Sequence, residues 1–126
     1  PFALTQACMP LLTQASDSAV VFMLDAPELV QRAHWGGYGV SKAALQRFVA
    51  ILHQETDEST LRVHAMLPAP MRTALRRLAY FGEDSMQQPS PDAAAQAAVY
   101  LLSAQALAAR GAVLDLRPDP PTDVTR

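Results

Sequence analysis

The order of apolar and polar positions along the chain predicts three short strands. Residues 19–24 read Ala-Val-Val-Phe-Met-Leu, an unbroken apolar run rich in β-forming side chains. A run without polar alternation is typical of a central parallel strand that is covered on both faces. Residues 61–67 indicate a second strand, which ends at Pro68, and residues 111–116 indicate a third.

The segments around these strands have the pattern of helices. Residues 2–12 indicate the end of one helix, and residues 38–54 indicate a long helix with one apolar side. An irregular connection over residues 25–35 precedes the long helix, and long connections often carry function. The apolar side of the long helix consists of Leu45, Phe48, Val49 and Leu52.

Two more helices are predicted in the second half of the chain. Residues 71–80 indicate a short helix with its arginines turned outward, towards solvent or, alternatively, a cofactor phosphate. An alanine-rich helix runs from Ser90 to about residue 108, because Ser90 can cap it and Pro and Asp suit its first positions. The outward arginines are Arg72, Arg76 and Arg77.

The alternation of helices and strands indicates an α/β fold with right-handed parallel crossovers. Three strands make a thin sheet. The strand at residues 19–24 is built for neighbours on both edges, and no segment before Pro1 supplies one of them. We therefore expect part of a sheet to be missing.

Composition excludes several classes of function. The 126 residues include ten basic and twelve acidic side chains, which give no concentrated cationic surface for nucleic acid or an anionic membrane. No apolar run reaches the roughly 18 residues of a membrane span. We expect one soluble, cytoplasmic domain.

Cysteine and histidine placement predicts no metal site. Cys8 is the only cysteine, which excludes an internal disulfide and suits a reducing cytoplasm. His34, His53 and His64 are 19 and 11 residues apart, without a ligand-spaced pair. We expect His64 to be a packed strand residue and Cys8 to be an inert buried thiol.

Tyr38 and Lys42 are the candidate chemical pair. Four residues apart, they lie on one face of the predicted helix, one turn from each other. A nearby cation lowers a tyrosine pKa from its usual value of about 10, which makes the phenol a better acid or base. The alternative is an ordinary surface pair, and the spacing alone does not decide between the two.

Residues 35–45, Trp-Gly-Gly-Tyr-Gly-Val-Ser-Lys-Ala-Ala-Leu, resemble the entry to the active-site helix of the short-chain dehydrogenase/reductase family, with its YxxxK motif. Residues 2–12 are similar to that family's fourth helix, and residues 19–24 to its fifth strand. Residues 61–64 with Pro68, and residues 111–115, are similar to its sixth and last strands.

The resemblance implies a three-layer, Rossmann-like parallel sheet that is incomplete, because the family's N-terminal cofactor-binding half would precede Pro1. Residues 1–117 would form the C-terminal half of that domain, and residues 118–126 a flexible tail. Residues 33–36 and 71–74 resemble the YciK-like bacterial oxidoreductases most closely.

The implied activity is hydride transfer between NAD or NADP and a small carbonyl or alcohol substrate. Tyr38 would be the proton donor or acceptor, and Lys42 would lower its pKa and hold the nicotinamide ribose. Pro68 matches a Pro-Gly pair that approaches the nicotinamide, with Ala69 in place of the Gly. Thr73 falls near a threonine that reaches the cofactor's amide or phosphate, or else it satisfies local backbone as an early helical residue.

Asp25 occupies the position of the family's substrate-orienting serine, thirteen residues before Tyr38. A carboxylate donates no hydrogen bond unless it is protonated, and its charge raises the Tyr38 pKa, against Lys42. Between Ser18 and Tyr38 there is no Ser or Thr, so no hydroxyl is expected to replace it. Either Asp25 is held neutral or the site is impaired.

The chain also lacks a Gly-rich phosphate loop, so we expect these residues alone to be inactive. The alternatives to an NAD(P)-dependent oxidoreductase are a catalytically impaired relative and an inactive assembly fragment. In the family, the helices that correspond to residues 2–12 and 38–54 form a four-helix bundle between subunits. The resemblance therefore implies a homodimer or tetramer.

Overall fold

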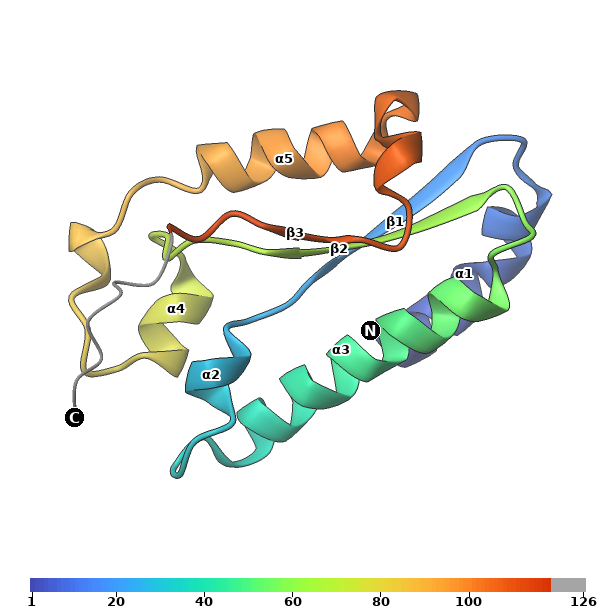
Figure 1. Cartoon of the computed structure of the whole chain (residues 1–126). Helices are drawn as coiled ribbons and strands as arrows, with labels where there is room; N and C mark the ends of the chain where they lie inside the picture. Colours follow the sequence, from blue (N-terminus) through green and yellow to red (C-terminus); the bar gives the residue numbers. More distant parts are fainter. Residues whose placement is uncertain (119–126) are drawn as a thin grey trace.

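A three-stranded parallel sheet is the centre of the computed structural model, which describes residues 1–118 (Figure 1). Its strands β1 (Ser18–Met23), β2 (Leu61–Leu67) and β3 (Val113–Asp115) lie in the order β1-β2-β3. Val20 pairs with Val63, and Met66 pairs with Leu114. The strands run in one direction, so their carboxyl ends meet at the same edge.

Helices cover both faces of this sheet. Helices α1 (Phe2–Gln14) and α3 (Gly36–Glu55) lie on one face, and α5 (Asp92–Leu102) lies on the other (Figure 1). This arrangement confirms the predicted three-layer α/β fold. The short helices α2 (Pro27–Val30) and α4 (Ala74–Ala79) follow β1 and β2 at the carboxyl edge, and two 3₁₀ turns, η1 (Ser85–Gln87) and η2 (Ala104–Ala109), flank α5.

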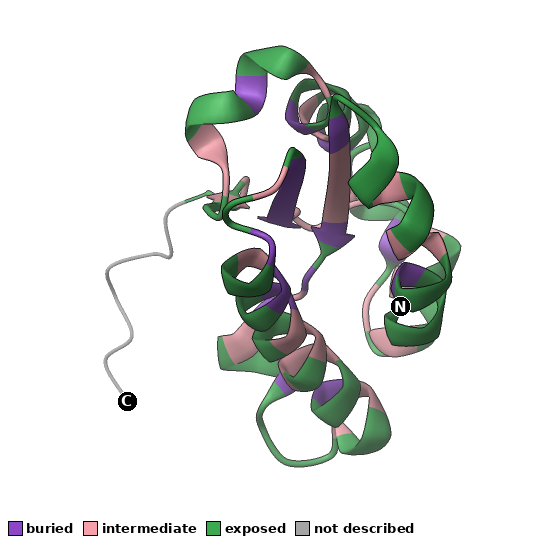
Figure 2. Cartoon of the chain, turned by 90° about the vertical axis from the view of Figure 1, so that its right-hand side faces the viewer, coloured by how far each residue is buried: buried purple, intermediate pink, exposed green. Residues whose placement is uncertain are grey.

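The core has two parts, separated by β2, whose seven residues are all buried (Figure 2). On one face, alternate β2 side chains such as Val63 pack against Val49 and Leu52 of α3. On the other face, Met66 packs against Leu101 of α5. The central strand therefore anchors both helical layers.

His64 is fully buried on β2, as expected for a packed strand residue. Burial lowers its pKa below the usual value, because desolvation disfavours the charged imidazole. Cys8 is a free thiol that is only partly buried, so its predicted burial is incomplete.

Helix boundaries differ from the predictions where side-chain caps act. Helix α4 is shorter than residues 71–80, because the Thr73 hydroxyl accepts from the Arg76 N–H at 3.1 Å and starts the helix there. The alanine-rich helix ends at Leu102 and continues as η2. Ser90 does not cap it, since its hydroxyl donates to Asp92 Oδ2 at 2.7 Å instead.

Strand β1 has the apolar sequence of a central strand but lies at an edge of the described sheet, which agrees with the expectation that part of the sheet is missing. Among residues 1–118 it pairs with β2 alone, so its other edge is open.

The predicted flexible tail covers residues 118–126, and all of it except Pro118 lies outside the described residues. Within the described part of the chain, no helix has the length and apolar character to cross a membrane.

Candidate active site

The candidate site lies at the carboxyl ends of β1 and β2, where ligands bind in open parallel sheets. Asp25 follows β1, Tyr38 and Lys42 lie in the first two turns of α3, and Tyr80 ends α4. A cavity of about 220 Å³ joins them. It is lined by Met23, Leu24, Asp25, Tyr38, Lys42, Pro68, Ala69, Met71, Thr73, Leu75, Arg76 and Tyr80.

Gly39 lets α3 approach α2 closely enough to place Tyr38 beside Asp25. A Cβ atom at Gly39 would lie 2.0 Å from the Val30 carbonyl oxygen and 3.1 Å from Trp35 Cβ. Only glycine fits this contact between two backbones. The glycine within the Tyr-to-Lys motif is therefore a structural requirement of the site.

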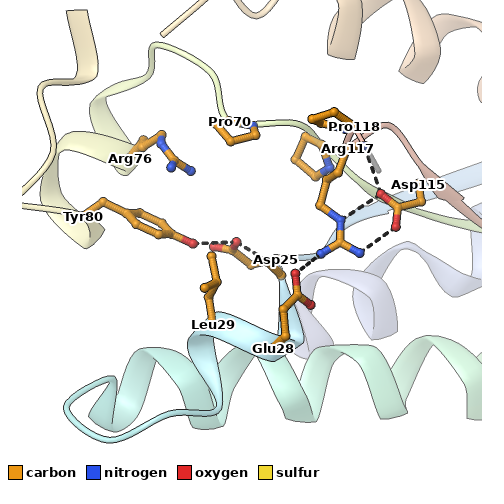
Figure 3. Close-up of a pocket in the computed structure, with 11 residues that line it drawn as sticks. Asp25, Glu28, Leu29, Pro70, Arg76, Tyr80, Asp115, Arg117 and Pro118 are labelled. Atoms are coloured by element: carbon orange, nitrogen blue, oxygen red, sulfur yellow. Dashed lines mark hydrogen bonds and ion pairs between the residues drawn. The ribbon is translucent and has the colours of Figure 1, made fainter. Parts of the chain in front are cut away.

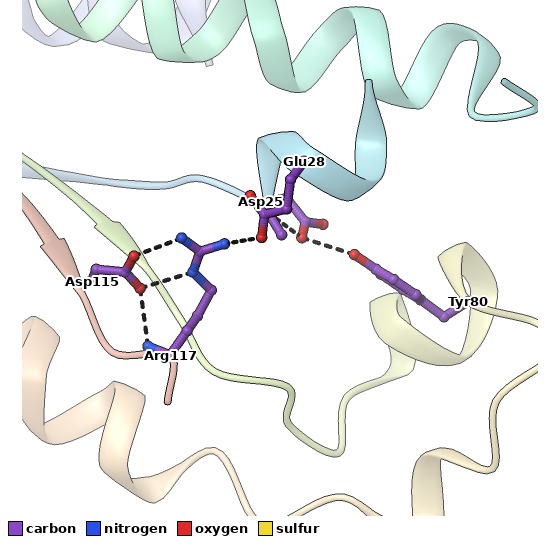
Figure 4. Close-up of polar contacts among 6 residues, drawn as sticks. Asp25, Glu28, Tyr80, Asp115 and Arg117 are labelled. Carbon is purple, nitrogen blue, oxygen red and sulfur yellow. Dashed lines mark hydrogen bonds and ion pairs between the residues drawn. The ribbon is translucent and has the colours of Figure 1, made fainter. Parts of the chain in front are cut away.

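Asp25 holds two phenols at once. The Tyr38 hydroxyl donates to Asp25 Oδ2 at 2.5 Å, and the Tyr80 hydroxyl donates to Asp25 Oδ1 at 2.9 Å. The Ala26 N–H also donates to Oδ1, at 2.8 Å. Figures 3 and 4 show the Tyr80 side chain pointing at this carboxylate. Asp25 is thus an acceptor in all three hydrogen bonds.

Tyr80 corrects the expectation that no hydroxyl is available near the serine position. The centre of its ring lies 4.8 Å from that of the Trp35 ring. The Arg76 guanidinium lies over the Tyr80 ring, 4.0 Å from the ring centre. Sequence reasoning missed Tyr80 because it lies 55 residues from Asp25 and carries no motif. The only available signal was its place in the segment after β2.

Burial raises the pKa of Tyr38 above its ordinary value, and the hydrogen bond to Asp25 and the charge of that carboxylate raise it further. The same causes raise the pKa of Tyr80 to about 12. Arg76 acts in the opposite direction on both phenols. Lys42 is not among these causes, so the predicted lowering of the Tyr38 pKa by Lys42 is not found, whereas the predicted rise caused by Asp25 is confirmed.

Lys42 lies against the ring of Tyr38 instead of its hydroxyl. Its Nζ is 5.6 Å from the ring centre and donates to the Met23 carbonyl oxygen at 3.2 Å. An ammonium has three N–H donors, and this contact uses one of them. The side chain borders the 220 Å³ cavity.

Pro68, Ala69 and Thr73 border the same cavity. The Pro-Ala pair brings backbone to the cavity wall with no side chain larger than a proline ring. Thr73 satisfies the local backbone as the cap of α4, which was one of its two predicted roles. Because its oxygen accepts there, its hydroxyl hydrogen is free to donate.

Arg76 belongs to the site and is not turned outward as predicted. It pairs with Glu83 at 2.7 Å, whereas Arg72 and Arg77 are exposed. The preference of a guanidinium for both a carboxylate and an aromatic face explains its inward position. Together with Asp25, Pro68 and Tyr80 it borders both the 220 Å³ cavity and a larger one.

The larger cavity, of about 520 Å³, shares these four residues with the smaller one (Figure 3). Arg117 closes its far side, where it binds Asp115 at 2.6 Å and also contacts the Glu28 carboxylate (Figure 4). The cavity is lined by Asp25, Ala26, Glu28, Leu29, Pro68, Pro70, Arg76, Tyr80, Asp115, Arg117 and Pro118. Across residues 1–118, no group of three metal-ligating side chains is found.

Comparisons with known proteins agree with this architecture. A family model described as short chain dehydrogenase matches residues 1–81. The chain is 36% identical over 90 residues to the uncharacterized oxidoreductase YciK of Escherichia coli K12, which covers 71% of this chain and 35% of that protein.

Solved structures match over most of the described chain. A short chain dehydrogenase from Salmonella enterica serovar Typhi has a TM-score of 0.82 and 30% identity, covering 93% of this chain and 48% of its own. A structure from Escherichia coli CFT073 in complex with NADPH has a TM-score of 0.81 and 31% identity, with the same coverage. The chain spans about half the length of these structures and about a third of the curated relative.

Proposed function

The chain belongs to the short chain dehydrogenase family, and from that membership we propose that the protein containing it is an NAD(P)-dependent oxidoreductase. It transfers a hydride between the nicotinamide and a small carbonyl or alcohol substrate. The supporting observation is that Tyr38 and Lys42 border one cavity at the carboxyl ends of β1 and β2.

The residues that border this cavity fit the nicotinamide and its ribose. Lys42 offers N–H donors to ribose hydroxyls, the backbone at Pro68 and Ala69 admits a flat ring, and Thr73 offers a hydroxyl hydrogen to an amide or phosphate. The neighbour from Escherichia coli CFT073 holds NADPH, and another from Shigella flexneri 2a holds NADP. When bound, the nicotinamide supplies the hydride or accepts it.

In this proposal Tyr38, which borders the cavity together with Lys42, moves a proton at its Oη. Lys42 positions the ribose and the phenol ring relative to each other. Asp25 replaces the serine hydroxyl that orients the substrate in the family. Tyr38, Lys42 and Asp25 form the catalytic group, and Lys42, Pro68 and Thr73 form the cofactor contacts.

A second candidate function is a family member that retains the fold but not the chemistry. It is favoured by one observation, the commitment of the Tyr38 hydroxyl to Asp25 at 2.5 Å. A phenol whose pKa is raised by burial and by that carboxylate is a weaker acid towards a substrate carbonyl.

The test is an assay of the protein encoded by the complete reading frame, with NADH and NADPH against a panel of carbonyl compounds. We expect turnover that falls by about 10²- to 10⁴-fold in Tyr38→Phe, the usual range for a lost acid–base group. Tyr100→Phe is the matched control, because Tyr100 lies on α5 across the sheet. Turnover that appears only in Asp25→Ser supports the second candidate instead.

We also propose that the protein is a cytoplasmic homo-oligomer that associates through α1 and α3. These helices expose large apolar side chains to solvent: Phe2, Leu4 and Leu11 on α1, and Val40 and Ile51 on α3. Exposed apolar surface of this kind marks interfaces. The free thiol of Cys8 suits a reducing compartment.

A further inference from the structure

We infer that Asp25 is the terminal proton acceptor of a short relay through Tyr38, and that Tyr80 is the positioning residue that holds Asp25 for this role. The inference rests on the proposed oxidoreductase function and assigns a chemistry to the carboxylate that stands at the serine position. It is carried by the two hydrogen bonds that reach opposite oxygens of one carboxylate.

The direction of the first hydrogen bond defines what Tyr38 presents to the cavity. A phenol has one O–H donor, and Tyr38 uses it on Asp25 Oδ2. Its remaining lone pairs are acceptors. The 2.5 Å separation is in the range of a strong hydrogen bond between a hydroxyl and a carboxylate, so a proton can pass along it without movement of either side chain. The site as built is therefore ready to receive a proton from an alcohol.

The relay is balanced when an alcohol is oxidised. The alcohol O–H bond breaks and its proton passes to Tyr38 Oη, while the proton that Tyr38 already carries passes to Asp25 Oδ2. The alcohol C–H bond breaks with its electron pair, and the hydride leaves to an oxidised nicotinamide dinucleotide as the C=O bond forms. Tyr38 ends neutral and Asp25 ends protonated, and carbonyl reduction follows the same path in reverse.

Tyr80 fixes which carboxylate oxygen takes the proton. Its hydroxyl and the Ala26 N–H both bind Asp25 Oδ1, which leaves Oδ2 to Tyr38. The Tyr80 ring is itself held between Trp35 and the guanidinium of Arg76. Loss of the Tyr80 hydroxyl would leave the Ala26 N–H as the one remaining donor to Oδ1, so only that amide and Tyr38 would then hold the carboxylate.

Other titratable groups border the two cavities around Asp25, and both cations and carboxylates are among them. They are Glu28 from α2, Tyr38 and Lys42 from α3, Arg76 and Tyr80 from α4, and Asp115 and Arg117 across the larger cavity.

The first experiment tests the hydrogen bonds of Tyr38 and Tyr80 to Asp25 and does not require catalytic activity. In the protein encoded by the complete reading frame, the ring carbons of Tyr38 and Tyr80 are assigned by NMR and followed to alkaline pH. In Asp25→Asn, phenolate should form at lower pH at both tyrosines than in wild type, because the carboxylate charge is gone. Asp25→Ser is the second variant. An unchanged onset for Tyr38 in both variants would overturn the relay.

The second experiment measures coupling by kinetics of alcohol oxidation. Tyr80→Phe keeps the ring and removes only the hydroxyl, and it should lower kcat about ten- to a hundredfold, with KM changed less than about twofold. In an Asp25→Ser background the same change should have no effect on kcat, since no carboxylate remains to be positioned. Asp25→Asn should lower kcat about 10²-fold, because the side-chain amide cannot take the proton.

The outcomes separate this inference from the proposed function. Turnover that Tyr38→Phe abolishes, while Asp25→Asn and Tyr80→Phe leave kcat unchanged, overturns the relay and leaves the oxidoreductase standing. An inactive wild type with an active Asp25→Ser overturns both the relay and the proposed activity of the native site. Coupled losses in Asp25→Asn and Tyr80→Phe support the relay, and Tyr100→Phe controls for loss of an unrelated phenol.

Discussion

Replacing Gly39 by alanine tests whether the close contact between α3 and α2 builds the site. The added Cβ would lie 2.0 Å from the Val30 carbonyl oxygen, whereas ordinary contact begins at 3.4 Å, so the helices must separate by about 1.4 Å. A backbone carbonyl cannot rotate away as a side chain can. Overpacking of this kind costs about 3 kcal/mol at the upper end, and the helix preference of alanine returns about 1 kcal/mol. We expect a net loss of about 2 kcal/mol.

Gly37→Ala is the matched control, because it lies two residues earlier in α3 and a Cβ there meets no atom within 4 Å. Urea unfolding should show a loss for Gly39→Ala and no loss for Gly37→Ala. The displacement also moves Tyr38 away from Asp25, and a shift of about 1 Å in a reacting group lowers turnover by about 10²-fold. A Gly39→Ala protein as stable as wild type would refute the reasoning.

Three further predictions concern the core and the surface. Leu101→Ala should cost about 2 to 5 kcal/mol of unfolding free energy, and Leu102→Ala far less, because the first side chain is buried and the second is half exposed. Since the pKa of His64 is lowered in the fold, the unfolded chain binds a proton that the native chain does not, and stability should fall as pH drops below about 6.5. Urea titrations should show His64→Gln with a smaller fall, and an equal fall would contradict this cause. Leu11→Glu should lower the mass found by light scattering, and the equally exposed Leu78→Glu should not.

Much of the fold follows from local pattern. The apolar run of β1 and the helical spacing of apolar residues in α3 can each be recognised within a short stretch of sequence. The structure has both elements close to their predicted places. The apolar sequence of β1 is that of a strand with two neighbours, and its edge position among residues 1–118 agrees with the expectation that one neighbour is missing. The start of α4 at Ala74 was not predicted, because it depends on one side-chain cap, from Thr73.

The site was predictable only where its residues are close in sequence. Tyr38 and Lys42 were found from their four-residue spacing. Asp25 was found because it lies thirteen residues before Tyr38, at the position of the family's serine. Tyr80 and Arg76 reach the site through tertiary packing of α4 against the loop after β1, which no local pattern encodes. The sign of the Tyr38 pKa shift depended on burial and on Asp25, and both are properties of the folded chain.

Asp25, Pro68, Arg76 and Tyr80 border both cavities, so a compound in either one contacts the same four residues. A compound that fills the 520 Å³ side presses on the same carboxylate and phenol that border the Tyr38 side. By thermodynamic linkage the effect is mutual: whatever changes affinity on one side by a given factor is itself bound with affinity changed by that factor. An inhibitor designed for the larger space would therefore act without displacing anything held by Lys42.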